Sequence, residues 1–185
     1  MAGSRHREEF LNINFSRLLN EMEILSDPET IESRDGRNRL LDIVFTYQGI
    51  RGILEGKIAD VANCQSILER DCAKRIEEGL AYIVIGIIYP AHLRGSKQSE
   101  IRQHMLDATY LINVFSESGN TGWMNEDIEG INRIIRVAYE SLVSENIVDR
   151  AVDNLDQHIE FAASLLSSSP GTYERLKTLL TSPNS

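Results

Sequence analysis

The sequence has little cysteine, proline and tryptophan: two, four and one among 185 residues. Cys64 and Cys72 fall in a stretch with helical periodicity, where a rise of about 1.5 Å per residue places them too far apart for a disulfide. Neither cysteine has a second Cys or a His at metal-ligand spacing. The sequence therefore predicts two reduced cysteines and no zinc site.

Long hydrophobic runs are also lacking. The longest spans residues 80–90, about half of the roughly 20 residues that a membrane-spanning helix needs. The first ten residues are polar and charged, without the apolar core of a signal peptide. We therefore expect no membrane span and an intracellular location, cytoplasmic or otherwise. The net charge is −9, with the acidity greatest after residue 110, which disfavours non-specific nucleic-acid binding through that part.

Signatures of catalysis are missing as well. No glycine-rich phosphate loop follows a predicted strand, and no nucleophile elbow is present. His6, His92, His104 and His158 are scattered, without the paired Glu-x-x-His sets of a di-iron bundle. We therefore expect no metal and no cofactor. An enzyme is the least favoured class and requires a site that gathers distant residues in the interior of a bundle.

Apolar residues recur every three to four positions along much of the chain, which is typical of helices. Residues 80–89 are rich in β-branched side chains, so a buried strand competes there, but the helical phase of the preceding residues favours a helix. The sequence predicts an all-α, single-domain helical bundle over residues 1–185, with about five main helices, short helices and flexible ends at 1–7 and 181–185. The helices are expected over residues 8–25, 38–48, 62–89, 99–117, 125–142 and 144–166.

Several shorter signals punctuate this pattern. A short helix is expected to begin after Asp27 and Pro28, and Asp35-Gly36 marks a turn. Gly49, Gly52 and Gly56 predict a helix break, a close helix crossing or a hinge.

The C-terminal segment carries the string Leu176-Lys177-Thr178-Leu179-Leu180. Its three leucines, Leu176, Leu179 and Leu180, share one face of a short helix and suit docking into a hydrophobic groove. The serine-rich segment 167–171 precedes it, so residues 167–185 are predicted to form a detachable C-terminal helix. This helix packs on its own bundle or docks on a protein partner or a second copy of the chain.

Two further places are candidate binding residues. Trp123, the single tryptophan, stands beside a glycine-containing loop and is either an interface anchor or a cap on its own core. Arg34, Arg37 and Arg39 flank the predicted turn at 35–36 and suit an anion or a nucleic acid, although nearby carboxylates offer them partners too.

These observations favour a non-enzymatic helical protein that acts through protein–protein contacts as a regulatory or assembly subunit, oligomers included. The alternative is a nucleic-acid- or anion-binding helical module that uses Arg34, Arg37 and Arg39.

Overall fold

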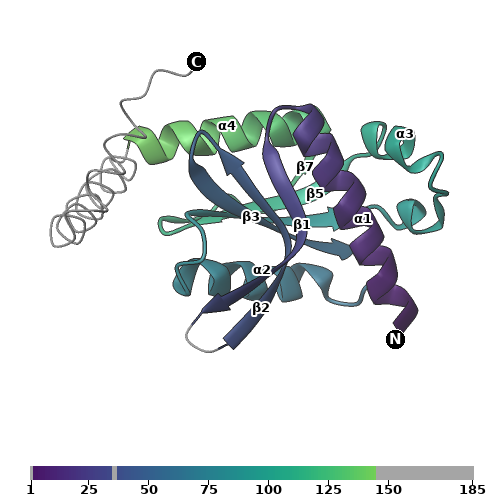
Figure 1. Ribbon diagram of the computed structural model, residues 1–185, viewed down its shortest axis with the longest axis horizontal. Coiled ribbons are helices and arrows are strands. Elements are labelled where there is room, and N and C mark those ends of the chain that lie inside the picture. The colour runs from purple at the N-terminus through teal and green to yellow at the C-terminus, as the bar shows by residue number, and fades with distance from the viewer. Residues whose placement is uncertain (1, 35–36, 145–185) are drawn as a thin grey trace, which may run out of the picture. The chain divides into compact units, whose positions relative to one another are not determined.

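The computed structural model describes residues 2–34 and 37–144, with the side chains of residues 2–6, 32–34, 37, 39 and 143–144 left aside. It shows a mixed α/β fold with a seven-stranded sheet and four α-helices, so the prediction of an all-α helical bundle is wrong (Figure 1). Residues 1–139 form one compact unit, and residues 140–185 belong to a second.

The elements follow one another in a regular order along the chain. The helices are α1 (Ala2–Glu21), α2 (Cys64–Glu77), the 3-10 helix η1 (Ala91–Gly95), α3 (Ile101–Leu106) and α4 (Ile128–Ser144), and the strands are β1 (Leu25–Arg34), β2 (Arg37–Tyr47), β3 (Ile50–Ile58), β4 (Ile83–Tyr89), β5 (Tyr110–Ser116), β6 (Gly119–Asn120) and β7 (Met124–Glu126).

The sheet combines an antiparallel meander with one parallel pair. Its order is β1-β2-β3-β4-β5-β6, with β7 also paired to β5. Strands β1, β2 and β3 are antiparallel neighbours, whereas β3 and β4 are parallel and are joined through α2. A parallel connection needs such a crossover because its strands start at the same edge of the sheet.

The predicted helix over 62–89 is divided between α2 and β4. All seven residues of β4 are buried, so the strand shows no alternation of polar and apolar positions. A strand covered on both faces reads as one continuous apolar run, and its periodicity cannot be told from that of a buried helix. The same error joined α3 to β5, which were predicted as one helix over 99–117.

The hairpin of β1 and β2 was also predicted as helical. Strand β1 is an edge strand, and this position tolerates Pro28 because the outer side of the strand needs no ladder donor. Leu40, Leu41 and Val44, which were read as a helical stripe, lie on β2. The predicted turn at 35–36 falls between the two strands, and its own residues lie outside those described.

The three closely spaced glycines serve a turn and two close contacts. Gly49 follows Gln48 in the turn between β2 and β3, where both residues have positive φ, as a two-residue hairpin requires. A Cβ added to Gly52 would meet the ring of Phe45, and one added to Gly56 would lie 2.7 Å from the ring of Tyr89. The expected break is therefore present as a hairpin turn within the sheet.

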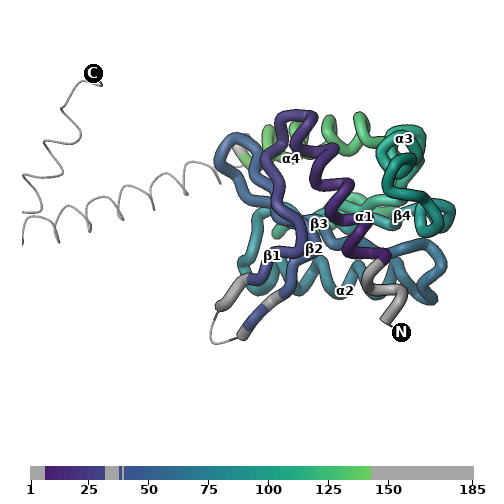
Figure 2. Tube along the Cα trace, turned by 45° about the vertical axis from the view of Figure 1, so that its right-hand side comes forward, coloured from purple at the N-terminus to yellow at the C-terminus, as the bar shows by residue number. Residues whose placement is uncertain are grey.

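Helices α1 and α2 cover opposite faces of the sheet. A Cβ on Gly56 would lie 2.8 Å from Asn12 of α1, whereas a Cβ on Gly86 would lie 3.3 Å from the sulfur of Cys72 in α2. Glu55, which precedes Gly56, pairs with Gly86, so alternation along β3 places the two glycines on different faces. The chain trace in Figure 2 can be followed from α1 through the sheet to α2.

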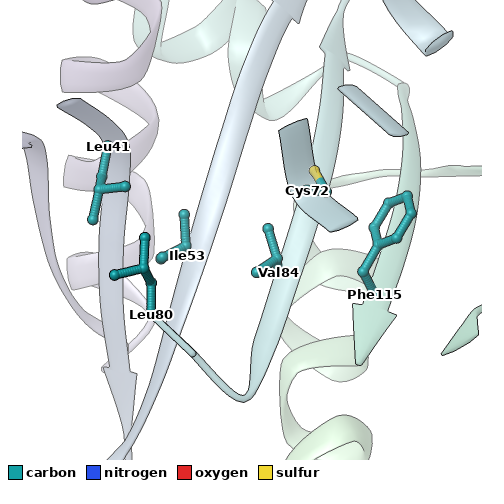
Figure 3. Close-up of a cluster of buried hydrophobic side chains, with 6 residues drawn as sticks. All are labelled: Leu41, Ile53, Cys72, Leu80, Val84 and Phe115. Carbon is teal, nitrogen blue, oxygen red and sulfur yellow. The ribbon is translucent and has the colours of Figure 1, made fainter. Parts of the chain in front are cut away.

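The face under α2 holds a hydrophobic cluster. Side chains from four neighbouring strands, Leu41, Ile53, Val84 and Phe115, meet Cys72 of α2 and Leu80 (Figure 3). Burial is the largest of the causes that raise the pKa of the Cys72 thiol, and no disulfide joins Cys72 to Cys64. Both cysteines are reduced, as the sequence predicts.

Helices α1 and α4 agree with the sequence. The expected stripe of α1 is buried at Leu11, Phe15 and Leu18, and Phe15 makes edge-on contacts with Tyr89 and Tyr110 beneath it. Helix α4 begins after Asp127, whose carboxylate accepts a hydrogen bond of 2.7 Å from the Gly130 N–H. The expected cap, Asn125, lies instead on β7. None of the helices among the described residues combines the length and hydropathy that crossing a membrane requires.

Candidate functional site

The site begins where two neighbouring strands part. The ladder between β2 and β3 runs from Tyr47↔Ile50 to Ile43↔Leu54 and is recorded no further (Figure 1). Beyond that point β2 still pairs with β1, and β3 still pairs with β4 up to Ile58. Polar groups of both strands at this divergence therefore need partners other than the ladder.

Asp42 is the first residue of β2 past the divergence, and its side chain replaces a ladder partner. Its Oδ2 accepts a hydrogen bond of 2.7 Å from the backbone N–H of Gly56 on β3. The bond holds the carboxylate between the two strands, beside Glu55 and Lys57 in the sequence of β3.

Glu55 is a buried carboxylate on β3 that is held from α2. Its Oε1 accepts a bond of 2.7 Å from Nε of Arg75, and the exposed fractions of the two side chains are 8% and 13%. The same guanidinium donates through Nη2 to the carbonyl oxygen of Leu40 on β2, at 3.0 Å. Arg75 therefore spans the two parted strands.

Lys57 brings a positive charge to the same place. Its Nζ lies 3.4 Å from Oε2 of Glu8 on α1 and donates to the carbonyl oxygen of Gly56 at 2.9 Å. Acidic and basic groups from α1, β2, β3 and α2 thus meet around one point of the sheet.

A buried polar network adjoins these charges. The hydroxyl of Tyr89 donates to Oδ1 of Asn12 at 3.0 Å, and Nδ2 of Asn12 donates to Oε1 of Glu29 at 2.8 Å. Glu29 has a φ of 53°, a left-handed conformation that is unusual for a residue with a side chain. It interrupts β1 between Pro28 and Thr30, the positions that flank Asp42 across the ladder. Strained backbone of this kind gathers at functional sites.

The electrostatics of the site are those of an unneutralised acidic pair. Burial, followed by repulsion from Asp42, raises the pKa of Glu55 from 4.5 to about 7, against the opposing effect of Arg75. Burial likewise raises the pKa of Asp42. Burial lowers the pKa of Lys57, but the carboxylates of Asp42, Glu8 and Glu55 outweigh it, so the pKa of Lys57 is raised. Lys57 is therefore protonated at neutral pH.

Such a pair suits a hard divalent cation. Among the described residues no three His, Cys, Asp or Glu side chains form a ready metal cage. Mg²⁺ does not need one, because it keeps several waters and is usually held by one or two carboxylates together with phosphate oxygens of a substrate. Asp42 and Glu55 supply two carboxylates, and a cation between them would offset the repulsion that raises the pKa of Glu55.

The residues predicted from the sequence as candidates are not the ones that build this site. Arg34, Arg37 and Arg39 lie on β1 and β2, where Arg34 pairs with Arg37 across the hairpin. This arginine-bearing hairpin continues β2 beyond Asp42, but its anion- or nucleic-acid-binding role stays a prediction. Leu176, Leu179 and Leu180 lie outside the described residues, so the partner-docking helix is also untested.

Trp123 packs against its own chain. Its Nε1 donates to Oε1 of Glu69 on α2 at 2.6 Å, and its Cη2 lies 3.5 Å from the position of a Cβ on Gly86. Of the two interpretations of this residue, the cap on its own core matches these contacts, and its role as an interface anchor stays a prediction.

Trp123→Phe should lower the free energy of unfolding by about 0.5–1 kcal/mol, because it keeps the ring over Gly86 and removes one hydrogen bond near the surface. Urea unfolding measures the change. Glu69→Gln retains an acceptor for the indole and serves as the control, with a smaller loss expected. Equal stability of the wild type and Trp123→Phe would show that this bond contributes nothing.

The sequence analysis missed Asp42, Glu55 and Lys57 because it placed Asp42 in a helix and this part of β3 in a glycine-rich break. The available signal was the run Ile53-Leu54-Glu55-Gly56-Lys57-Ile58, in which two charged residues interrupt an apolar stretch at the two-residue period of a strand.

Comparisons with protein-family models, with curated proteins and with solved structures found no match to this chain. The chemistry of the site therefore has to be argued from its own residues.

Proposed function

We propose that this protein is an Mg²⁺- or Mn²⁺-dependent phosphodiester hydrolase that acts on nucleic acid. The observation that supports the proposal most is the meeting of the Asp42 and Glu55 carboxylates with Lys57 where β2 leaves β3. Carboxylates that share a divalent cation, beside a fixed positive charge, are suited to phosphoryl chemistry, in which charge develops on phosphate oxygens.

The choice of nucleic acid as substrate class rests on the hairpin next to the site. Strand β2 runs from Asp42 back to Arg39 and Arg37, so three arginines lie on the strand segments that continue from the site. Arginine suits phosphate groups because its planar guanidinium offers several donors. The overall charge of −9 makes a local basic element such as this hairpin necessary for contact with a polyanion.

Within this proposal each central residue has a separate task. Asp42 and Glu55 would hold the cation, which supplies Lewis-acid polarisation of the phosphate and of a bound water. Lys57, with its raised pKa, stays an ammonium group and so is suited to stabilising negative charge on the phosphate rather than to accepting a proton. Glu8 orients the ammonium group through its contact of 3.4 Å.

The reaction consumes one water for each bond cleaved. The water oxygen forms a bond to phosphorus as the bond from phosphorus to the leaving sugar oxygen breaks. The attacking water releases a proton to solvent, and the leaving oxygen takes one up. The products are a phosphate monoester and an alcohol, and no oxidant or reductant takes part.

The proposal is tested by incubating the full chain with single- and double-stranded DNA and RNA in Mg²⁺ or Mn²⁺. We expect cleavage of at least one of them that stops when EDTA is added. Lys57→Met should lower kcat by about a hundredfold, a loss typical of removing one group that stabilises transition-state charge. Lys97→Met, at an exposed lysine of another loop, is the matched control and should leave kcat unchanged. Absence of Mn²⁺ binding, or cleavage that Lys57→Met leaves unchanged, would refute the proposal.

The role of a non-enzymatic regulatory or assembly subunit stays a prediction, because the leucines behind it lie outside the described residues. A protein partner is compatible with a hydrolase, and the oligomeric state measured with and without residues 167–185 tests it separately.

A further inference from the structure

The carboxylates of the site are each engaged through one oxygen by a donor of the protein. Oδ2 of Asp42 accepts from the Gly56 N–H, and Oε1 of Glu55 accepts from Nε of Arg75, both at 2.7 Å. A carboxylate that keeps such a bond has a single oxygen left with which to bind a cation.

Arg75 is fixed at both ends of its guanidinium group. While Nε bonds Glu55 on β3, Nη2 bonds the carbonyl oxygen of Leu40 on β2, past the recorded end of the ladder. The side chain is only 13% exposed, and its fork gives two bonds in fixed directions. Turning Glu55 to offer both oxygens to a cation would break the bond to Nε and leave a buried charge without its partner, which is costly.

The number of oxygens available bears on which cation fits. Ca²⁺ takes six to eight oxygen ligands and commonly binds carboxylates through both oxygens, whereas Mg²⁺ takes six at shorter distance and retains waters. We infer that Arg75 is a positioning residue that sets cation selectivity: by holding Oε1 of Glu55, it limits this carboxylate to one-oxygen coordination and disfavours Ca²⁺ relative to Mg²⁺. The inference rests on the proposed function, since it assumes that Asp42 and Glu55 hold a cation.

The selectivity can be separated from the charge of Arg75. Removing a positive charge near a site strengthens the binding of Mg²⁺ and Ca²⁺ together, because both carry the same charge. A change in their affinity ratio therefore reports coordination rather than electrostatics. General damage to the fold would weaken both cations and would not favour Ca²⁺.

The test uses Mn²⁺ bound to the full chain and followed by electron paramagnetic resonance, with Mg²⁺ and Ca²⁺ as competitors. In the wild type, Mg²⁺ should displace Mn²⁺ at a concentration about tenfold below that of Ca²⁺. Arg75→Met, which keeps the length of the side chain and removes its donors, should shift this ratio toward Ca²⁺ by about tenfold, the scale on which groups around a metal ligand act. Arg70→Met, at an exposed arginine of the same helix, should leave the ratio unchanged.

Each outcome bears on one of the two ideas. No binding of Mn²⁺ by the wild type contradicts the proposed function itself. Binding of Mn²⁺ with equal displacement by Ca²⁺ and Mg²⁺ in the wild type overturns the selectivity inference alone, and this measurement needs no variant to fold. An unchanged ratio in a folded Arg75→Met protein overturns it as well.

Discussion

Asp42→Asn is expected to slow Mg²⁺-dependent cleavage by about a thousandfold or more, since a cation that stabilises transition-state charge is worth several kcal/mol. The amide removes the negative charge of the ligand while its oxygen can still accept the Gly56 N–H bond that joins β2 to β3. The loss should therefore fall on catalysis and metal binding rather than on the fold.

The measurement combines single-turnover cleavage with Mn²⁺ binding, and circular dichroism checks that the variant is folded. Asp107→Asn, at an exposed carboxylate after α3, is the matched control and should behave as the wild type. A folded Asp42→Asn protein that cleaves at the normal rate would remove Asp42 from the site.

Glu55→Gln is expected to stabilise the metal-free protein at pH 8 by about 1–3 kcal/mol, although it impairs function. The pKa of Glu55 is raised to about 7 in the folded protein from an ordinary value of 4.5, with burial as the largest cause. The folded state thus binds this proton more tightly than the unfolded chain does. The resulting stability is fully present below about pH 4.5 and is lost as the pH rises to about 7.

Glutamine is neutral at every pH and so escapes that loss. Thermal unfolding in EDTA should therefore show the variant to be more stable than the wild type at pH 8 and similar to it at pH 4.5. The control is Glu77→Gln at an exposed position of α2, for which no such difference between the two pH values is expected. If Glu55→Gln were less stable than the wild type at pH 8, the pairing with Arg75 would outweigh the desolvation of Glu55, and the raised pKa would be wrong.

Prediction from the sequence worked where one face of an element is buried and the other is polar. Helix α1 alternates between Leu11, Phe15 and Leu18 on its buried side and exposed Arg17 on the other, so its period is readable. It failed at β4, where both faces are covered and every position is apolar. Once β4 was read as helix, the parallel pair of β3 and β4 could not be anticipated, and the site at its edge was lost with it.

The sequence by itself determined the acidic charge, the two reduced cysteines, helices α1 and α4 and the turn before Arg37, because composition and local periodicity are properties of neighbouring residues. Only the tertiary structure decided that Asp42, Glu55, Lys57, Glu8 and Arg75 meet. They come from α1, β2, β3 and α2, and what brings them together is the pairing of strands and the covering of the sheet by helices on both faces. Pairing is an interaction between distant segments, and a two-residue shift in register would separate the same side chains without changing any local pattern.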